Sequence, residues 1–402
     1  MRKHNINKLY WLNPIGIYAF WMLLMIYTYT IPNKNLITLF ETPNFVSFEN
    51  VLVYLLFFIV FCLGCFSASN SGFGTYKINE SKEIKTYKLL FIIYFFANVI
   101  WYINLGITYG GNIYMLVLSN LTGYYNMFKV DGGHISGITT FTEIGIVVAP
   151  YGYYLWRKTR KKWILKSLVC LFFLNTLRAL IFAERIAILN TFIPCFAIFI
   201  LFYRGRHWNL IKYIPIFAIV ILFVFFGIFE YFRSWLYYKD IYDGSFVTFI
   251  IDRVFVGYYS LSINNECLYM NKGGLNYFPN KILEWVWLLP GLSSIRTSFM
   301  PSYGDLLGKY ANQEFNNFGG LLSCYTDLGF FGLLPQFVFG YIMYKSYKGF
   351  LYKRYMYTFI YAISIYALLE LPRYFFWGSN RSFFVFIGLA IIRYNVLKKV
   401  KI

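Results

Sequence analysis

Charged side chains are scarce in this sequence. Only 13% of its 402 residues are Asp, Glu, Lys or Arg, whereas a soluble domain carries about 25%. Hydrophobic residues make up 59% of the chain and aromatic residues 23%. A water-soluble protein with so few charges could not hide that much apolar surface, so the composition excludes an ordinary soluble domain.

Histidine is also scarce, and the cysteines form no pattern typical of a disulfide-rich or metal-binding protein. The three histidines, His4, His134 and His207, are far apart in the sequence, which argues against a His-based metal site. Five of the six cysteines fall in or beside apolar stretches, so we expect no disulfide framework. The Cys62-x-x-Cys65 pair has no second pair or histidine nearby, and we interpret it as small membrane-core residues rather than a zinc or redox site. We therefore expect neither a metal nor another cofactor.

The chain is rich in apolar blocks, and about 20 apolar residues suffice to cross the hydrocarbon core of a membrane. Ten blocks qualify: 14–31, 50–67, 88–106, 137–156, 163–182, 186–203, 213–231, 317–344, 355–371 and 381–397. The first resembles a signal sequence but is followed by no small-x-small cleavage site, so we expect a retained span. The sequence predicts an all-α polytopic membrane protein with about ten transmembrane helices, forming a single integral membrane domain over residues 1–402.

The basic residues predict the orientation of these helices. With the connecting segments assigned alternately to two sides, one side holds 24 of the 37 Lys and Arg residues. Every short segment on that side is basic, including the run from Arg157 to Lys162. The positive-inside rule makes this side, and with it both termini, cytoplasmic. The net charge of +20 is thereby explained by topology, and we expect no nucleic-acid partner.

Two sizeable segments are left on the predicted outer side, about 107–136 and 232–316. The second is a large external loop that is not very polar, and Trp285 and Trp287 within it favour the headgroup layer. We expect it to form amphipathic helices on the outer membrane surface rather than a separate globular domain.

Arginine is frequent on the predicted outer side, at Arg178, Arg185, Arg233, Arg253, Arg296, Arg373 and Arg381. Arg178 and Arg185 lie in one short loop, and Arg373 and Arg381 lie in another. A charge so near the hydrocarbon is costly. An arginine fork matches phosphate and carboxylate groups and keeps its proton, so converging arginines would suit a pyrophosphate carried on a membrane lipid. In the alternative interpretation, Arg178 and Arg373 pair with Glu184 and Glu370 and only tie helices together. Two glutamates cannot, however, neutralise the four arginines of these loops.

A second cluster of interest is the segment 316–332, which contains Asp327 about ten residues into an otherwise apolar span. An acid within a membrane segment is a functional candidate, here as part of a substrate cavity or as the partner of an external arginine. The glycines around it would permit close helix packing.

Two of these patterns carry a resemblance to a known family. The Arg178…Glu184-Arg185-Ile-Ala-Ile-Leu and Asn317-Phe-Gly-Gly…Asp327-Leu-Gly-Phe-Phe-Gly patterns, with the spans and the late external loop, resemble the Wzy-type O-antigen and oligosaccharide repeat unit polymerases. The resemblance implies an enzyme of the bacterial inner membrane that uses undecaprenyl pyrophosphate-linked oligosaccharides. It would transfer a growing glycan onto a lipid-linked repeat unit at the outer face, beside a flippase and a chain-length regulator of the same pathway.

The resemblance also suggests roles for single residues. Arg178 and Arg185 match the external arginine motif of the family, whereas Arg233, Arg253, Arg296, Arg373 and Arg381 are assigned to pyrophosphate or glycan binding from their charge alone. A carboxylate would take the proton of the attacking sugar hydroxyl. Glu184 and Asp327 are the first candidates for it, with Asp240, Asp243 and Asp252 behind them.

Three other functions compete with this interpretation. An O-antigen ligase is expected to carry an external histidine, and the only one here, His134, lies outside the large loop. A lipid-linked oligosaccharide flippase should show short loops on both sides, which the external loop of 232–316 argues against. A membrane O-acyltransferase would need a histidine-based motif that the sequence does not show.

Overall fold

The computed structural model describes residues 7–110, 138–182, 185–203, 208–240, 242–275, 277–289, 291–292 and 303–399. The chain divides into two compact units, each built from three separate stretches of sequence. Unit 1 comprises Met1–Gly72, Ile251–Lys348 and Ala367–Ser382, and unit 2 comprises Phe73–Ile250, Gly349–Tyr366 and Phe383–Ile402. The expectation of a single integral membrane domain stays a prediction.

The described residues are mostly helical. The α-helices that begin in unit 1 are α1 (Pro14–Thr30), α2 (Asn33–Phe40), α3 (Phe48–Ala68), α14 (Leu261–Leu268), α16 (Tyr303–Tyr310), α17 (Ser323–Leu328), α18 (Leu333–Leu351) and α20 (Ser382–Val396). Those that begin in unit 2 are α4 (Glu80–Tyr109), α7 (Ile138–Phe141), α8 (Gly145–Thr159), α9 (Lys162–Phe182), α10 (Ile186–Phe202), α11 (Ile214–Glu230), α12 (Leu236–Tyr238), α13 (Phe246–Ile251) and α19 (Tyr355–Leu369). The described strands are β1 (Tyr76–Ile78) and β2 (Leu397–Lys399), which pair antiparallel in unit 2.

Shorter helical turns connect or extend these helices. Those of 3-10 type are Asn7–Leu12, Thr142–Ile144, Trp208–Tyr213, Glu284–Leu288, Gln313–Phe315, Gly329–Gly332 and Phe376–Gly378. Those of π type are Tyr231–Trp235, Asp252–Ser260 and Tyr269–Gly273. The last two continue α13 and α14 into one long helix, Phe246–Gly273.

The helices are those expected of a multi-pass membrane protein. Among the described residues, five helices are long and apolar enough to cross a membrane: Phe48–Ala68, Glu80–Tyr109, Lys162–Ile181, Leu210–Glu230 and Phe246–Gly273. The bent pair of α1 and α2, with 95° between its helices, makes a sixth if it is counted as one span. The helices α10, α19 and α20 are apolar but shorter. Each of the ten predicted blocks contains a helix, but the number of ten spans and their orientation stay predictions.

One span-length helix falls where the sequence predicts the large external loop. Phe246–Gly273 has 28 residues and lies within the segment 232–316. The polar residues in its second half, Asn264, Asn265 and Glu266, are buried, which explains why the segment looks only moderately apolar. The position of this segment on the outer membrane surface stays a prediction.

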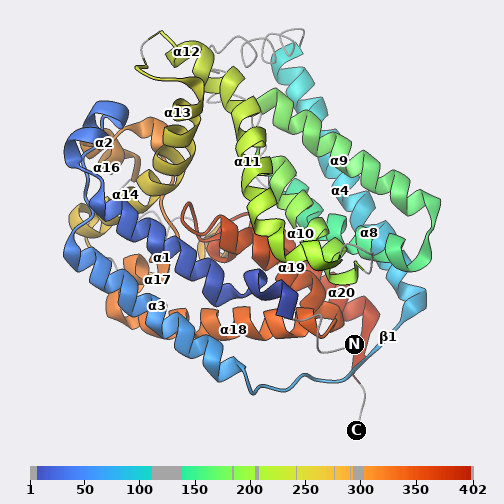
Figure 1. Ribbon diagram of the computed structural model, residues 1–402. Helices are drawn as coiled ribbons and strands as arrows, with labels where there is room; N and C mark the ends of the chain where they lie inside the picture. Colours follow the sequence, from blue (N-terminus) through green and yellow to red (C-terminus); the bar gives the residue numbers. More distant parts are fainter. Residues whose placement is uncertain are drawn as a thin grey trace. The chain divides into compact units, whose positions relative to one another are not determined.

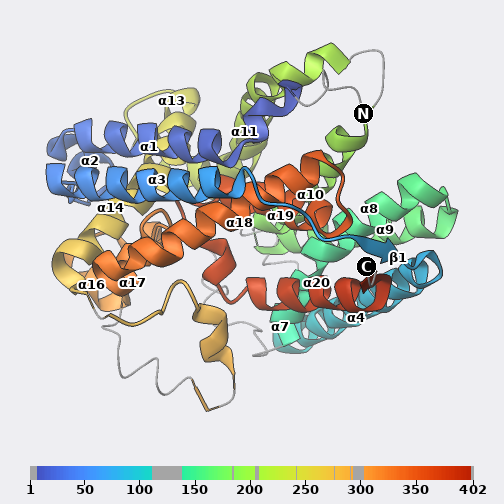
Figure 2. The same cartoon turned by 90° about the horizontal axis from the view of Figure 1, so that it is seen from below.

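In unit 1, the helices α1, α3 and α18 lie side by side (Figures 1 and 2). Their local sequences favour these starts: Asn13 caps α1 ahead of a proline at its first position, and Ser47 forms a reciprocal capping box with Asn50 at the start of α3. Glycine allows α3 and α18 to touch, because a side chain at Gly64 would overlap the backbone of α18. Close approach through small residues is typical of helix packing in membranes.

The core of unit 1 ties these helices to the segments that carry the predicted motifs. The Tyr18 hydroxyl on α1 donates to the carbonyl oxygen of Leu321 at 2.8 Å, and the indole nitrogen of Trp21 donates to that of Leu368 at 2.7 Å. Both aromatic side chains are buried. Since a lost partner of a buried polar group costs about 1–3 kcal/mol, these bonds fix the segment before α17 and the last turn of α19 against α1.

Candidate functional site

Three segments of unit 1 meet around glycines of the segment 316–332 and of the loop that holds Arg373 and Arg381. Gly319 forms a parallel bridge with Tyr374 and has a φ angle of +66°, a conformation that favours glycine. A side chain at Gly320 would overlap the backbone at Tyr374, and one at Gly378 would overlap the carbonyl oxygen of Lys281. The glycines therefore bring the chain near residues 281, 320 and 374 into direct backbone contact.

Two buried carboxylates and a lysine lie at this junction. Glu266 on α14 accepts hydrogen bonds from the Tyr54 hydroxyl at 2.6 Å and the Leu322 backbone N–H at 3.1 Å. Asp327 on α17 is 4% exposed and accepts from the backbone N–H of Ile282 at 2.9 Å. The ammonium group of Lys281 interacts electrostatically with both acids.

Lys281 is held in this position by an aromatic residue of the second motif. Its Nζ donates to the carbonyl oxygen of Phe318 at 3.3 Å and lies 3.7 Å from the centre of the Phe318 ring. Burial lowers the pKa of Lys281 to about 8, against the opposing effect of the two neighbouring acids, Glu266 and Asp327. Within the described part of the chain, the cation beside Asp327 is thus this lysine, rather than the arginine that the sequence suggested.

Two of the predicted arginines approach the same tyrosine in unit 1. The guanidinium carbons of Arg253 and Arg373 lie 5.9 and 5.6 Å from the centre of the Tyr258 ring. Arg253 forms an ion pair with Glu314, and Arg373 donates to Glu370 at 2.7 Å. The pairing of Arg373 with Glu370 is the one that the alternative interpretation predicts.

The pairing with Glu370 does not use all the donors of Arg373. Its Nε atom is buried and has no hydrogen-bond partner among the described residues. A buried donor without a partner is costly and needs an explanation. A bound anion would provide the missing acceptor, since an arginine fork offers parallel donors to phosphate oxygens. Arg381 lies nearby in the same loop, 5.7 Å from the centre of the Tyr374 ring.

Arg178 and Arg185, the two arginines that carry the sequence resemblance, belong to unit 2, where each has a carboxylate partner. On α9, Arg178 lies 3.8 Å from Glu143 and donates to the Thr142 hydroxyl at 3.0 Å. Arg185, which precedes α10, donates to Glu230 at 2.6 Å, and both side chains are buried. Its guanidinium carbon also lies 4.4 Å from the centre of the Phe226 ring.

The predicted site residues are thus distributed over both units. Asp327, Arg253, Arg373 and Arg381 lie in unit 1, and Arg178, Arg185 and Arg233 lie in unit 2. Glu184, Arg296 and His134 lie outside the described residues, as does the side chain of Arg233. Asp240 and Asp243 are exposed. Convergence of all seven arginines on one lipid pyrophosphate stays a prediction.

Sequence reasoning missed four acidic or basic residues at these sites: Glu143, Glu230, Glu266 and Lys281. The signal was present for the first two, because Glu143 and Glu230 fall inside the predicted spans 137–156 and 213–231. The rule that singled out Asp327 applies to them equally. Glu266 and Lys281 were overlooked because 232–316 was assigned to an external loop, and charged residues are ordinary in a loop that faces water.

Comparisons with known proteins do not identify the chain: no family model matches it, and no curated protein or solved structure gives a significant match. The resemblance to Wzy-type polymerases consequently rests on short motifs and topology. A function has to be inferred from the side chains described above.

Proposed function

We propose that this protein is a membrane glycosyltransferase of the oligosaccharide repeat unit polymerase type. It transfers a growing glycan from undecaprenyl pyrophosphate to a sugar hydroxyl of a lipid-linked repeat unit, at the outer face of the bacterial inner membrane. The observation that carries the proposal is the arrangement in unit 1. Arg253, which is buried, and Arg373, which is largely buried, approach one aromatic ring in the same unit as the Lys281 and Asp327 pair.

The arginines can stabilise the negative charge that develops on the pyrophosphate leaving group. In the transfer, the bond between the sugar C1 and the pyrophosphate oxygen breaks, and a bond from C1 to the acceptor oxygen forms. Negative charge develops on the pyrophosphate, and preorganised donors in a site with little water stabilise it strongly. Arg373 is suited to this role because its Nε is buried without a partner among the described residues.

The acceptor hydroxyl loses its proton, and Asp327 is the candidate base in the described site. Both carboxylate oxygens of Glu266 already accept hydrogen bonds, from Tyr54 and Leu322, so we assign Glu266 a positioning role for Lys281. The ammonium group of Lys281 compensates the charge of the two acids in a buried place, where an uncompensated carboxylate would be costly.

Deletion of the gene in its native host tests the proposal. The surface glycan of the deletion strain should show single repeat units on the acceptor in place of a ladder of chain lengths, because a polymerase acts after transport of the unit and is not needed for its final attachment. Gel analysis of the glycan reads this out, with the wild-type gene on a plasmid as the control. A normal ladder in the deletion strain would contradict the proposal, and complete loss of glycan would indicate a ligase or flippase.

The pKa of Lys281 predicts a pH dependence of the reaction. Since this pKa is lowered to about 8, the ammonium group is charged below pH 8 and loses its proton above it, so the rate should fall on the alkaline side. In Lys281→Arg the positive charge persists at high pH. The pH at which the rate falls should therefore be higher than in the wild type by at least one unit, which is a tenfold change in proton concentration. Initial rates of glycan elongation in membranes between about pH 6.5 and 9.5 measure this. An unchanged alkaline limb in Lys281→Arg would remove Lys281 from the site.

A further inference from the structure

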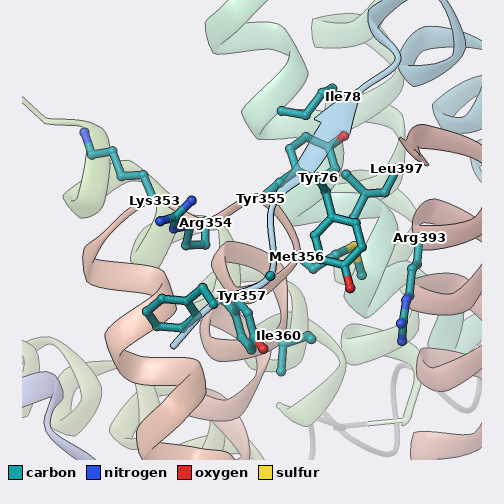
Figure 3. Close-up of a pocket in the computed structure, with 12 residues that line it drawn as sticks. Tyr76, Ile78, Lys353, Arg354, Tyr355, Met356, Tyr357, Ile360, Arg393 and Leu397 are labelled. Carbon is teal, nitrogen blue, oxygen red and sulfur yellow. The ribbon is translucent and has the colours of Figure 1, made fainter. Parts of the chain in front are cut away.

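Unit 2 contains a cavity at the junction of its small sheet with two helix ends. The cavity has a volume of about 310 Å³ and lies between β1, the end of α20 and the start of α19. In Figure 3, Lys353 and Arg354 lie on one side of it and Arg393 on the other, with Tyr76 and Met356 between them. The cavity thus has basic sides and a largely apolar interior.

The charge of the cavity is not compensated by its own walls. None of the twelve residues that line it is acidic. The guanidinium group of Arg354 lies 5.6 Å from the centre of the Phe73 ring. Neither this group nor that of Arg393 has an ion pair or hydrogen bond with the described residues. Two arginine forks at one cavity whose lining contains no acid are suited to an anion with several oxygen acceptors.

The cavity lies at the predicted cytoplasmic ends of the spans. Tyr76 and Arg354 fall in the connecting segments 68–87 and 345–354, and Arg393 lies near the cytoplasmic end of the predicted span 381–397. The positive-inside rule explains why these segments are basic. It does not explain why three cations line one cavity together with apolar side chains. Basic pockets beside membrane helices on the cytoplasmic side are suited to the head groups of anionic lipids.

We propose that this cavity binds an anionic phospholipid of the inner leaflet. Arg354 and Arg393 hold the headgroup phosphate, and Met356, Ile360 and Leu397 contact the start of an acyl chain. A lipid fits better than a free phosphate, because more than half of the lining is apolar and the cavity borders α19 and α20, two of the apolar helices. The inference does not depend on the proposed glycan transfer.

Lipid titrations of the purified, full-length protein in detergent test this inference. Dihexanoyl phosphatidylglycerol, kept below its micelle concentration, should raise the melting temperature in a saturable way, whereas dihexanoyl phosphatidylcholine should not. In the double variant Arg354→Gln/Arg393→Gln, the apparent affinity for phosphatidylglycerol should fall about tenfold or more, because two charge-assisted contacts are lost. The single variant Arg393→Gln, an exposed position, should show part of this loss and serves if the double variant does not fold.

A matched control separates a specific pocket from general attraction. Lys162→Gln/Lys166→Gln removes the same charge from exposed positions of α9 on the predicted cytoplasmic side and should keep the wild-type affinity. Equal losses in the two double variants would overturn the inference, because they would indicate diffuse electrostatics. So would equal stabilisation by both lipids, or stabilisation by inorganic phosphate at the same concentrations, which would indicate a phosphate site rather than a lipid site.

Discussion

Replacing Arg185 by alanine is expected to lower the amount of folded protein sharply. The Arg185 guanidinium group donates to Glu230 at 2.6 Å, and Glu230 is completely buried. Its second carboxylate oxygen accepts from the Ser234 hydroxyl at 2.9 Å, so the glutamate is held in place when the arginine is removed. Breaking a buried ion pair by removing one partner costs about 3–5 kcal/mol. Thermal unfolding of the detergent-solubilised variant should show this loss as a lower melting temperature.

A second substitution separates this structural effect from catalysis. In Arg185→Met/Glu230→Gln, no buried charge is left without its partner, and the melting temperature should return most of the way to that of the wild type. Lys166→Ala, at an exposed position of α9, should leave it unchanged. If Arg185→Ala melts like the wild type, the Arg185–Glu230 pair does not stabilise unit 2. If the folded double variant elongates glycans normally, Arg185 is not required for the reaction.

Arg373→Lys is expected to abolish most of the polymerase activity while leaving the protein folded. Lysine keeps the charge that faces Glu370, but it cannot replace the planar fork or the Nε donor that has no partner in the described structure. Loss of one preorganised donor at a developing negative charge lowers a rate by about 100-fold or more. The glycan of a deletion strain carrying this variant should show single repeat units, with protein amounts close to wild type.

The matched control for this variant is Arg157→Lys. Arg157 lies on the predicted cytoplasmic side and donates to the carbonyl oxygen of Phe202 at 3.3 Å, so the exchange is the same but falls in unit 2, outside the residues of the proposed site. It should give the wild-type ladder. A wild-type ladder from Arg373→Lys would show that Arg373 only holds its loop to Glu370, as the alternative interpretation has it.

The helical architecture could be predicted because it depends on local composition. A block of about 20 apolar residues has few alternatives to a helix in a membrane, and each of the ten blocks does contain a helix. Helices were predicted in the segment 232–316, but the span length of the helix Phe246–Gly273 was missed for a physical reason. Its buried Asn264, Asn265 and Glu266 find partners far along the chain, such as Tyr54, whose hydroxyl binds Glu266 across 212 positions. Hydropathy of the segment alone cannot reveal such partners.

The candidate site could be predicted in its residue types but not in its pairings. Asp327 stood out as an acid among apolar residues, and the pairing of Arg373 with Glu370 was accessible because the two are three positions apart. Arg185 and Glu230, in contrast, are 45 positions apart. The glycines of the segment 316–332 were expected to permit close helix packing, whereas Gly319 and Gly320 lie against the backbone at Tyr374, a contact that the sequence does not reveal.

Reconstitution tests the central claim most directly. The purified protein would be inserted into liposomes with an undecaprenyl pyrophosphate-linked repeat unit from its native host, and products would be followed by mass spectrometry. We predict glycans of two or more repeat units on the lipid, with one undecaprenyl pyrophosphate released for each new bond. Arg373→Lys should slow both products in parallel. Folded wild-type protein that moves the repeat unit across the bilayer, or leaves it unchanged, without forming a glycosidic bond would contradict the account.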